Sequence, residues 1–183
     1  MNIRNCLMHF AKIIGEDKKA DAIKFARQIT DEFEDLVQIM QMAVKHLCAT
    51  KVDYIKEIKI KSRNKVLHLS HIEDKYFHIT GVFKDGEKVD FKFSGDRKHI
   101  HVVENGVYEV RYTSYPNFYN LDEEMDQLIA PYYKAIYLSS CALWFLKNEQ
   151  FTYYKGFHND YVEELEYVEG EKNERVGNKS QRK

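Results

Sequence analysis

The sequence is poor in the residues that interrupt regular structure and in those that cross-link it. Its 183 residues include only 2 Pro, 8 Gly and 3 Cys. The cysteines, Cys6, Cys48 and Cys141, lie far apart and form no CxxC motif, so they predict reduced, buried thiols rather than disulfides, zinc ligands or nucleophiles. Reduced thiols are typical of a reducing compartment, and we therefore expect a cytoplasmic protein.

A dominant charge and long hydrophobic runs are also lacking. Lys and Arg number 28 against 29 Asp and Glu, a formal net charge of -1, so no global field attracts nucleic acid or an anionic membrane. No apolar run reaches the roughly 18 residues that a membrane span requires. The N-terminal apolar positions are interrupted by Lys12 without a cleavage site, which argues against a signal peptide.

The composition is that of a folded globular chain, with 44% hydrophobic and 31% charged residues. Tyr and Phe are abundant and Lys exceeds Arg, a bias compatible with an AT-rich genome such as that of a phage or mobile element. The length suits one domain. We expect a single α+β domain over residues 1–169 and a disordered polar tail over residues 170–183.

Helical periodicity marks the N-terminal part of the chain. Spacings of four, three and four predict a first helix with an apolar face of Ile3, Leu7, Phe10 and Ile14, ended by Gly15 at C′. A second helix is predicted from Asp17 to Ala49, with an apolar stripe sustained for about four heptads. Such a helix either packs in the core of the domain or pairs with a second copy as a homodimer.

From Val52 onward the apolar residues alternate with polar ones, as in strands with one buried face. The pattern predicts a five- to six-stranded antiparallel β-meander. Three-residue hairpin loops at 84–86 and 104–106, with Gly86 and Gly106 in the left-handed region, keep the apolar faces aligned. A two-residue turn at Asp85-Gly86 is the alternative.

A long third helix is predicted after Pro116. Asn120 and Glu123 form a capping box, and the apolar stripe continues to Leu146. Pro131 should kink this helix or restart it. We expect this long C-terminal helix to pack on one face of the sheet, since the helices are its only available cover.

Aromatic residues cluster on both sides of the third helix. The residues concerned are Tyr115, Phe118 and Tyr119 before it and Tyr153 and Tyr154 after it. These clusters exceed what a small core requires, and tyrosines are enriched in protein interfaces. They predict a surface that binds a macromolecular partner, such as a host protein bound by a phage accessory or inhibitor.

Two charged features support alternative functions. The basic stretch of residues 51–65 could contact a phosphate backbone through Lys56, Lys59, Lys61, Arg63 and Lys65, although lysines also protect exposed edge strands from mispairing. The predicted register places Asp90, His101 and Glu109 in one outward-facing row. This row could bind a divalent metal or supply a general base, although mixed charges are ordinary on a solvated sheet face.

No nucleotide-binding, zinc-protease or nucleophile-elbow motif is found in the sequence. This favours a non-enzymatic interaction protein without a cofactor. A nucleic-acid-binding module and a metal-dependent enzyme remain the alternatives.

Overall fold

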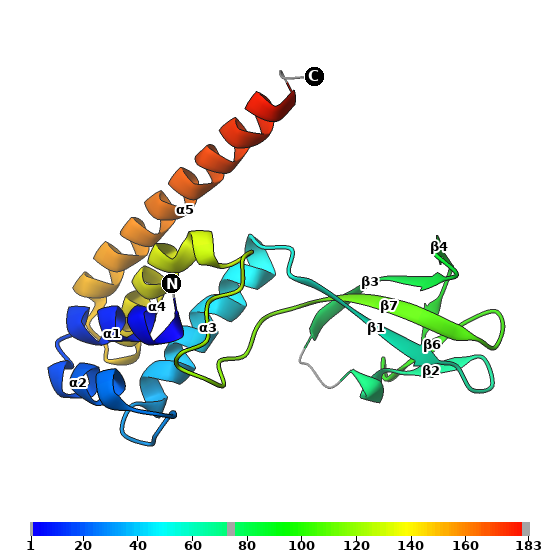
Figure 1. Cartoon of the computed structure of the whole chain (residues 1–183), viewed down its shortest axis with the longest axis horizontal. Coiled ribbons are helices and arrows are strands. Elements are labelled where there is room, and N and C mark those ends of the chain that lie inside the picture. The colour runs from blue at the N-terminus through cyan, green and yellow to red at the C-terminus, as the bar shows by residue number, and fades with distance from the viewer. Residues whose placement is uncertain (1, 73–75, 181–183) are drawn as a thin grey trace. The chain divides into compact units, whose positions relative to one another are not determined.

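The computed structural model describes residues 2–72 and 76–180, with residues 172–180 described by their backbone alone. Helices form both ends of the chain and antiparallel strands form its middle (Figure 1), which confirms the α+β class. The chain groups into two compact units. The helical unit comprises Met1–Leu47 and Pro116–Lys183, and the β unit comprises Cys48–Tyr115. The β unit is thus inserted in the sequence between two parts of the helical unit, and the single domain predicted over residues 1–169 stays a prediction.

The helices are α1 (Ile3–Ile13), α2 (Asp17–Phe25), α3 (Glu34–Thr50), η2 (Ala130–Tyr132), α4 (Tyr133–Lys147) and α5 (Phe151–Ser180). The first helix is confirmed at both ends. The Asn2 side chain caps it by accepting a hydrogen bond from the Asn5 backbone at 3.0 Å, and Gly15 follows it with a φ of 80°.

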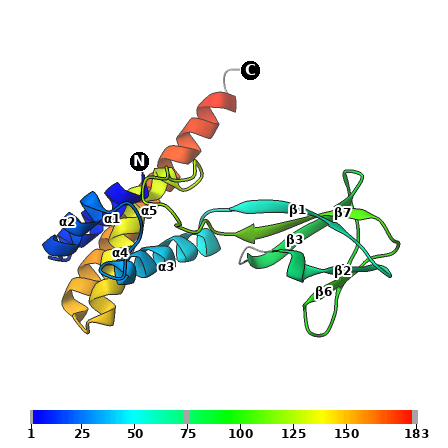
Figure 2. The same ribbon diagram turned by 60° about the horizontal axis from the view of Figure 1, so that its bottom comes forward.

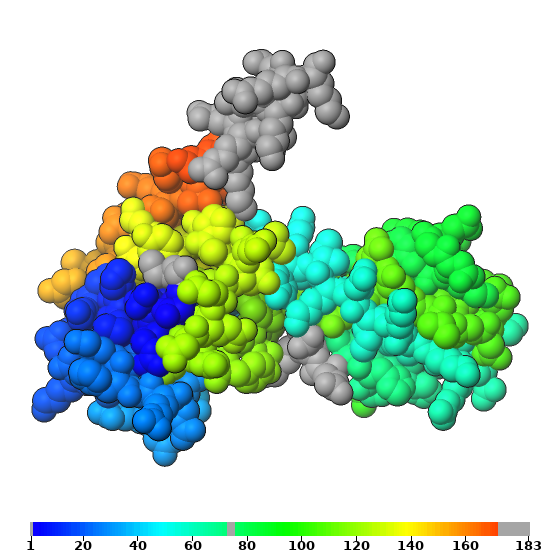
Figure 3. All heavy atoms as spheres, viewed as in Figure 1, coloured from blue at the N-terminus to red at the C-terminus, as the bar shows by residue number. Residues whose placement is uncertain are grey.

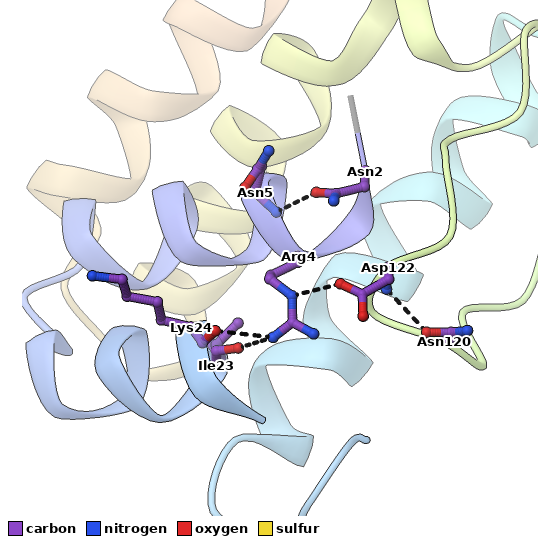
Figure 4. Close-up of polar contacts among 7 residues, drawn as sticks. All are labelled: Asn2, Arg4, Asn5, Ile23, Lys24, Asn120 and Asp122. Carbon is purple, nitrogen blue, oxygen red and sulfur yellow. Dashed lines mark hydrogen bonds and ion pairs between the residues drawn. The ribbon is translucent and has the colours of Figure 1, made fainter. Parts of the chain in front are cut away.

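The predicted continuous helix over residues 17–49 is wrong. The backbone adopts an extended conformation at Ala26, and the next helix begins at Glu34. Arg4 contributes to this break, because its Nη1 donates to the carbonyls of Ile23 and Lys24, which are among the last carbonyls of α2 (Figure 4). The Arg4 Nε also pairs with Asp122 at 2.8 Å.

The apolar stripe expected for the long helix is buried inside the helical unit instead. Its fully buried members on and just before α3 are Phe33, Leu36, Met40 and Val44. The stripe is therefore not continuous over four heptads, and a homodimer through this helix stays a prediction.

Residues 120–129 do not form the predicted start of the third helix. The Asn120 side chain accepts from the backbone of Asp122 at 3.0 Å and so caps a turn. The Ile3 and Arg4 amides at the start of α1 donate to the carbonyls of residues 123 and 121. This pairing satisfies amides that a helix leaves unpaired and holds the segment alongside α1 (Figure 3). Helical structure starts only with η2, which carries Pro131 in its first turn, as a proline restart predicts.

The side chain of Gln41 fixes the point where the chain returns from the β unit. Its amide nitrogen donates to the carbonyl of Pro116 at 2.6 Å, and its amide oxygen accepts from the Phe118 backbone at 3.0 Å. Both contacts lie within the helical unit.

Helix α4 contacts α1, η2 and α5, and its packing on a sheet face stays a prediction. On α4, Trp144 meets Phe10 edge to face at 6.4 Å, and Phe145 stacks against Tyr153 at 5.2 Å. Helix α5 extends to Ser180, where the sequence analysis expected a disordered tail from residue 170. Residues 181–183 lie outside the described residues.

The β unit holds β1 (Ile55–Lys61), β2 (Val66–His68), η1 (Leu69–His71), β3 (Tyr76–Lys84), β4 (Glu87–Lys88), β5 (Lys92–Phe93), β6 (His99–His101) and β7 (Val107–Ser114). The strands form two antiparallel sheets of order β1-β7-β3-β4 and β2-β6-β5. Figure 2 labels β1, β3 and β7 of the first sheet and β2 and β6 of the second. Antiparallel pairing is confirmed, but the meander is wrong, because the last strand lies between the first and third. Leu67, Val82, Ile100 and Val110, from both sheets, are completely buried in one core.

The two predicted three-residue turns are also wrong. Phe83 pairs with Lys88 and Lys84 with Glu87, so the loop is the two-residue alternative. Asp85 and Gly86 both have positive φ, 51° and 86°, as a type I′ turn requires. At 104–106 no hairpin forms, because β6 and β7 belong to different sheets, and Gly106 is not among the glycines with positive φ.

The Gly86→Ala substitution should destabilise the β unit by about 1 kcal/mol, because a Cβ is disfavoured at this φ. Gly95→Ala is the matched control, since neither glycine has a neighbouring atom within 4 Å and Gly95 lacks the positive φ. Urea denaturation monitored by amide exchange in the β unit measures both variants. Equal stability of the two variants would contradict the turn assignment.

Candidate functional site

A groove in the helical unit lies between one face each of α3, α4 and α5. Its volume is about 360 Å³. The residues that line this groove are Met42, His46, Ser139, Ala142, Leu143, Leu146, Tyr154, His158 and Tyr161. The lining is mainly apolar with a few polar groups, as in ligand and partner sites generally.

Helical spacing explains why these residues face the same space. On α4 the lining positions follow at three, one and three residues, on α5 at four and three, and on α3 at four. Each set therefore lies on one helix face. Ser139 and Ala142 are the smallest lining residues, and they leave room above the middle of α4.

Large apolar side chains stand exposed at the edges of the groove. Met42 is 57% exposed and Leu146 is 41% exposed. Phe151 (57%) and Val162 (40%) are also exposed on α5. They do not line the groove, but they lie seven residues before and four after His158, and this spacing places them on the same side of α5 as His158. Apolar side chains gathered around a groove in this way indicate an interaction surface, unlike scattered single exposures.

The α5 wall of the groove is aromatic. The rings of Tyr154 and His158 stack with centroids 5.5 Å apart, and His158 lies 6.2 Å from Tyr161. Burial raises the pKa of Tyr161 above its ordinary value, so its phenol stays neutral. The wall therefore offers flat apolar area with polar edges, which suits binding.

The five aromatic residues predicted to bind a partner differ in exposure. Tyr154 lines the groove, whereas Tyr153 is 60% exposed and stacks on Phe145. Tyr119 is 79% exposed in the segment before η2. Tyr115 and Phe118 are buried, which corrects their prediction as contact residues, because aromatic abundance alone does not separate core from surface.

The basic stretch forms an edge strand and the turn after it. β1 pairs only with β7 among the described strands. Lys59 and Lys61 are exposed on one face of β1, and Lys56 lies on the other with its Nζ 5.8 Å from the Tyr54 ring centroid. Arg63 and Lys65 are exposed beyond the strand. The five basic side chains therefore face more than one direction.

The predicted row of Asp90, His101 and Glu109 is not formed. Asp90 and His101 do line one hollow of about 460 Å³ together with Lys92. Glu109, however, lies opposite Lys59 and Phe83 in the other sheet, because no hairpin joins β6 to β7. Within residues 2–72 and 76–171, whose side chains are described, no cluster of three or more His, Cys, Asp or Glu side chains is arranged to hold a metal ion.

All three cysteines are free and buried, and burial raises the pKa of both Cys6 and Cys141 to about 12. These thiols stay protonated at neutral pH, so we expect little alkylation by iodoacetamide at pH 8 until the chain unfolds. Intact-mass measurement should show three additions in denaturant and essentially none before it. Rapid labelling of a native thiol would contradict the burial.

Sequence reasoning missed most of the groove. Met42 and His46 lie beside the apolar stripe predicted for the second helix rather than in it, and His158 lies in a segment for which no apolar face was predicted. Leu146 was predicted as the last residue of the apolar stripe of the third helix, but not as part of a groove. For Met42 the signal is an additional apolar position next to a buried stripe, but the same pattern occurs on ordinary half-buried helices.

No protein-family model matches the chain, and no curated protein is significantly similar to it. In the part of the chain that the structure describes, no helix is both long enough and apolar enough to cross a membrane.

Proposed function

We propose that this chain is a non-enzymatic interaction protein that binds a protein partner through the groove of its helical unit. The observation that carries the proposal is an apolar groove in whose lining Met42 and Leu146 are exposed. Burying such side chains against a partner is the main favourable term in protein association. An accessory or inhibitor protein of a phage or mobile element, acting on a host protein, fits the composition.

Affinity capture tests this proposal. Tagged protein is incubated with lysate of the organism that encodes it, with and without nuclease, and the recovered proteins are quantified by mass spectrometry. We expect one protein partner at near-stoichiometric yield that resists nuclease. Recovery that disappears with nuclease would contradict a protein partner.

Nucleic-acid binding by the β unit is the second candidate. This unit carries 13 Lys and Arg against 10 Asp and Glu, and Lys59 and Lys61 are exposed on its edge strand. Phosphate contacts would make the affinity fall steeply with salt. Anisotropy of a labelled oligonucleotide, measured at several salt concentrations, tests this candidate; a flat salt response would exclude phosphate contacts, and edge protection would then explain the lysines.

A further inference from the structure

We propose that the groove takes one amphipathic α-helix of the partner protein, apolar along one stripe and acidic on both flanks. This inference rests on the proposed function and deepens it by naming the chemistry of the partner.

The shape of the groove favours a helix. Its two walls, on α3 and α5, and its floor, on α4, are all helix faces. The floor runs from Ser139 to Leu146, seven residues or about 10 Å along the α4 axis, which matches the distance between positions i and i+7 of an added helix. Helices bound in grooves use anchors at such positions.

The exposure of the edges argues for the same occupant. Met42 and Leu146, which line the groove, are 57% and 41% exposed, so the site is an open slot rather than an enclosed cavity. An occupant would bury one side against Leu143 and Leu146 and leave its other side in water. An amphipathic helix has this division of apolar and polar surface.

The charges beside the groove favour carboxylates on the occupant. Lys45 is exposed on α3, three residues after Met42, and Lys155 is exposed on α5, three residues before His158. Each wall thus carries one ammonium group near its edge. Complementary charges at the rim of an interface select the partner and steer association.

The acidic residues of α5 limit the part of this helix that could lie beside carboxylates of the occupant. Glu164 does not line the groove and pairs with Lys134 of α4 at 2.6 Å. Glu166 and Glu169 come nearer to the groove-facing side of α5, but they follow Val162. The part of the α5 wall before these two carboxylates therefore covers residues 151–162, about three helical turns. Its charged residues are Lys155 and Asp160, and Asp160, two residues after His158, lies on the side of the helix opposite to it.

Labelled synthetic helices test the proposal by fluorescence anisotropy. Two peptides of about 18 residues, or five turns, share one leucine stripe and differ only in carrying Glu or Lys on both flanks. Wild-type protein should bind the Glu peptide at least tenfold more tightly than the Lys peptide. The Lys45→Glu/Lys155→Glu double variant should reverse this preference.

The fold of each variant is checked by far-UV circular dichroism and by the fluorescence of Trp144, the only tryptophan in the chain. A Glu peptide in which serines replace the leucines should not bind. If neither leucine peptide binds, or if both bind equally, the acidic helix is the wrong occupant. A protein partner whose capture still requires Met42 would keep the proposed function intact in that case.

Sedimentation equilibrium tests the remaining alternative, in which a second copy of the chain occupies the groove. A dimer that the Met42→Glu substitution dissociates would show that a second copy fills the groove, and this would overturn the proposal. A monomer at the concentrations used for the peptide titrations is the expected result.

Discussion

The Phe10→Ala substitution is expected to lower the free energy of unfolding of the helical unit by about 3–5 kcal/mol, the range for truncating a buried phenylalanine. Phe10 is completely buried, and its ring meets Trp144 edge to face at 6.4 Å. Loss of the ring would leave a cavity between α1 and α4, two helices that contact each other. A loss of this size is a large part of the total stability of a typical domain.

Trp144, the single tryptophan, lies in the helical unit, so its fluorescence reports the loss of stability of that unit alone. Urea unfolding followed by Trp144 fluorescence reports the helical unit, and amide exchange followed by mass spectrometry reports the β unit separately. Phe25→Ala is the control, because Phe25 is 77% exposed and its truncation should change stability by no more than about 0.5 kcal/mol. Equal losses for the two variants would contradict the packing described for α1.

A peptide of residues 48–115 is expected to fold without the rest of the chain. Both sheets and their common core lie within this segment. Its two ends are adjacent, since β1 pairs with β7 from Ile55–Thr113 onward and the Ser114 amide donates to the Tyr54 carbonyl at 2.9 Å. Adjacent ends allow an inserted unit to keep its fold when it is excised.

Cooperative urea unfolding of this peptide, followed by circular dichroism, is the measurement. A segment this short buries a smaller fraction of its surface than a larger domain does, so we expect a low but measurable stability. The Val110→Asp variant places a carboxylate in the fully buried core and should abolish the transition. A wild-type peptide that is already unfolded would show that the β unit depends on the helical unit.

Periodicity predicted the kinds of elements in this chain better than their partners. The first helix, its Gly15 terminus and the antiparallel strands follow from local rules and were confirmed. The meander failed because strand order depends on contacts between distant residues, such as Lys59 with Glu109. Nothing in the alternation of residues within β7 indicates that it pairs with β1 and β3 rather than with β6.

The helix errors have a similar physical origin. Apolar spacing continues through residues 26–33, but the Arg4 side chain binds carbonyls at the end of α2, and Arg4 is distant in sequence. Likewise, Asn120 has the chemistry of a helix cap, yet the carbonyl of Leu121 accepts from the amide of Arg4 at 2.8 Å. Local propensity was overridden in both places by hydrogen bonds from another part of the chain.

For the site, the sequence indicated the right kind of residue in partly the wrong places. Tyr154 belongs to the groove, but Tyr115 and Phe118 are buried. The exposure of Met42 and Leu146 at the groove could not be predicted from the sequence, because it depends on how α3, α4 and α5 pack together.

The most direct test of the groove as the binding site is quantitative capture of the partner by wild type, Met42→Glu and Phe25→Glu. Both substitutions put a carboxylate on an exposed apolar position of the helical unit, at 57% and 77% exposure, but only Met42 lines the groove. We expect Met42→Glu to reduce recovery at least tenfold and Phe25→Glu to leave it unchanged. Equal recovery by all three proteins would contradict binding at the groove.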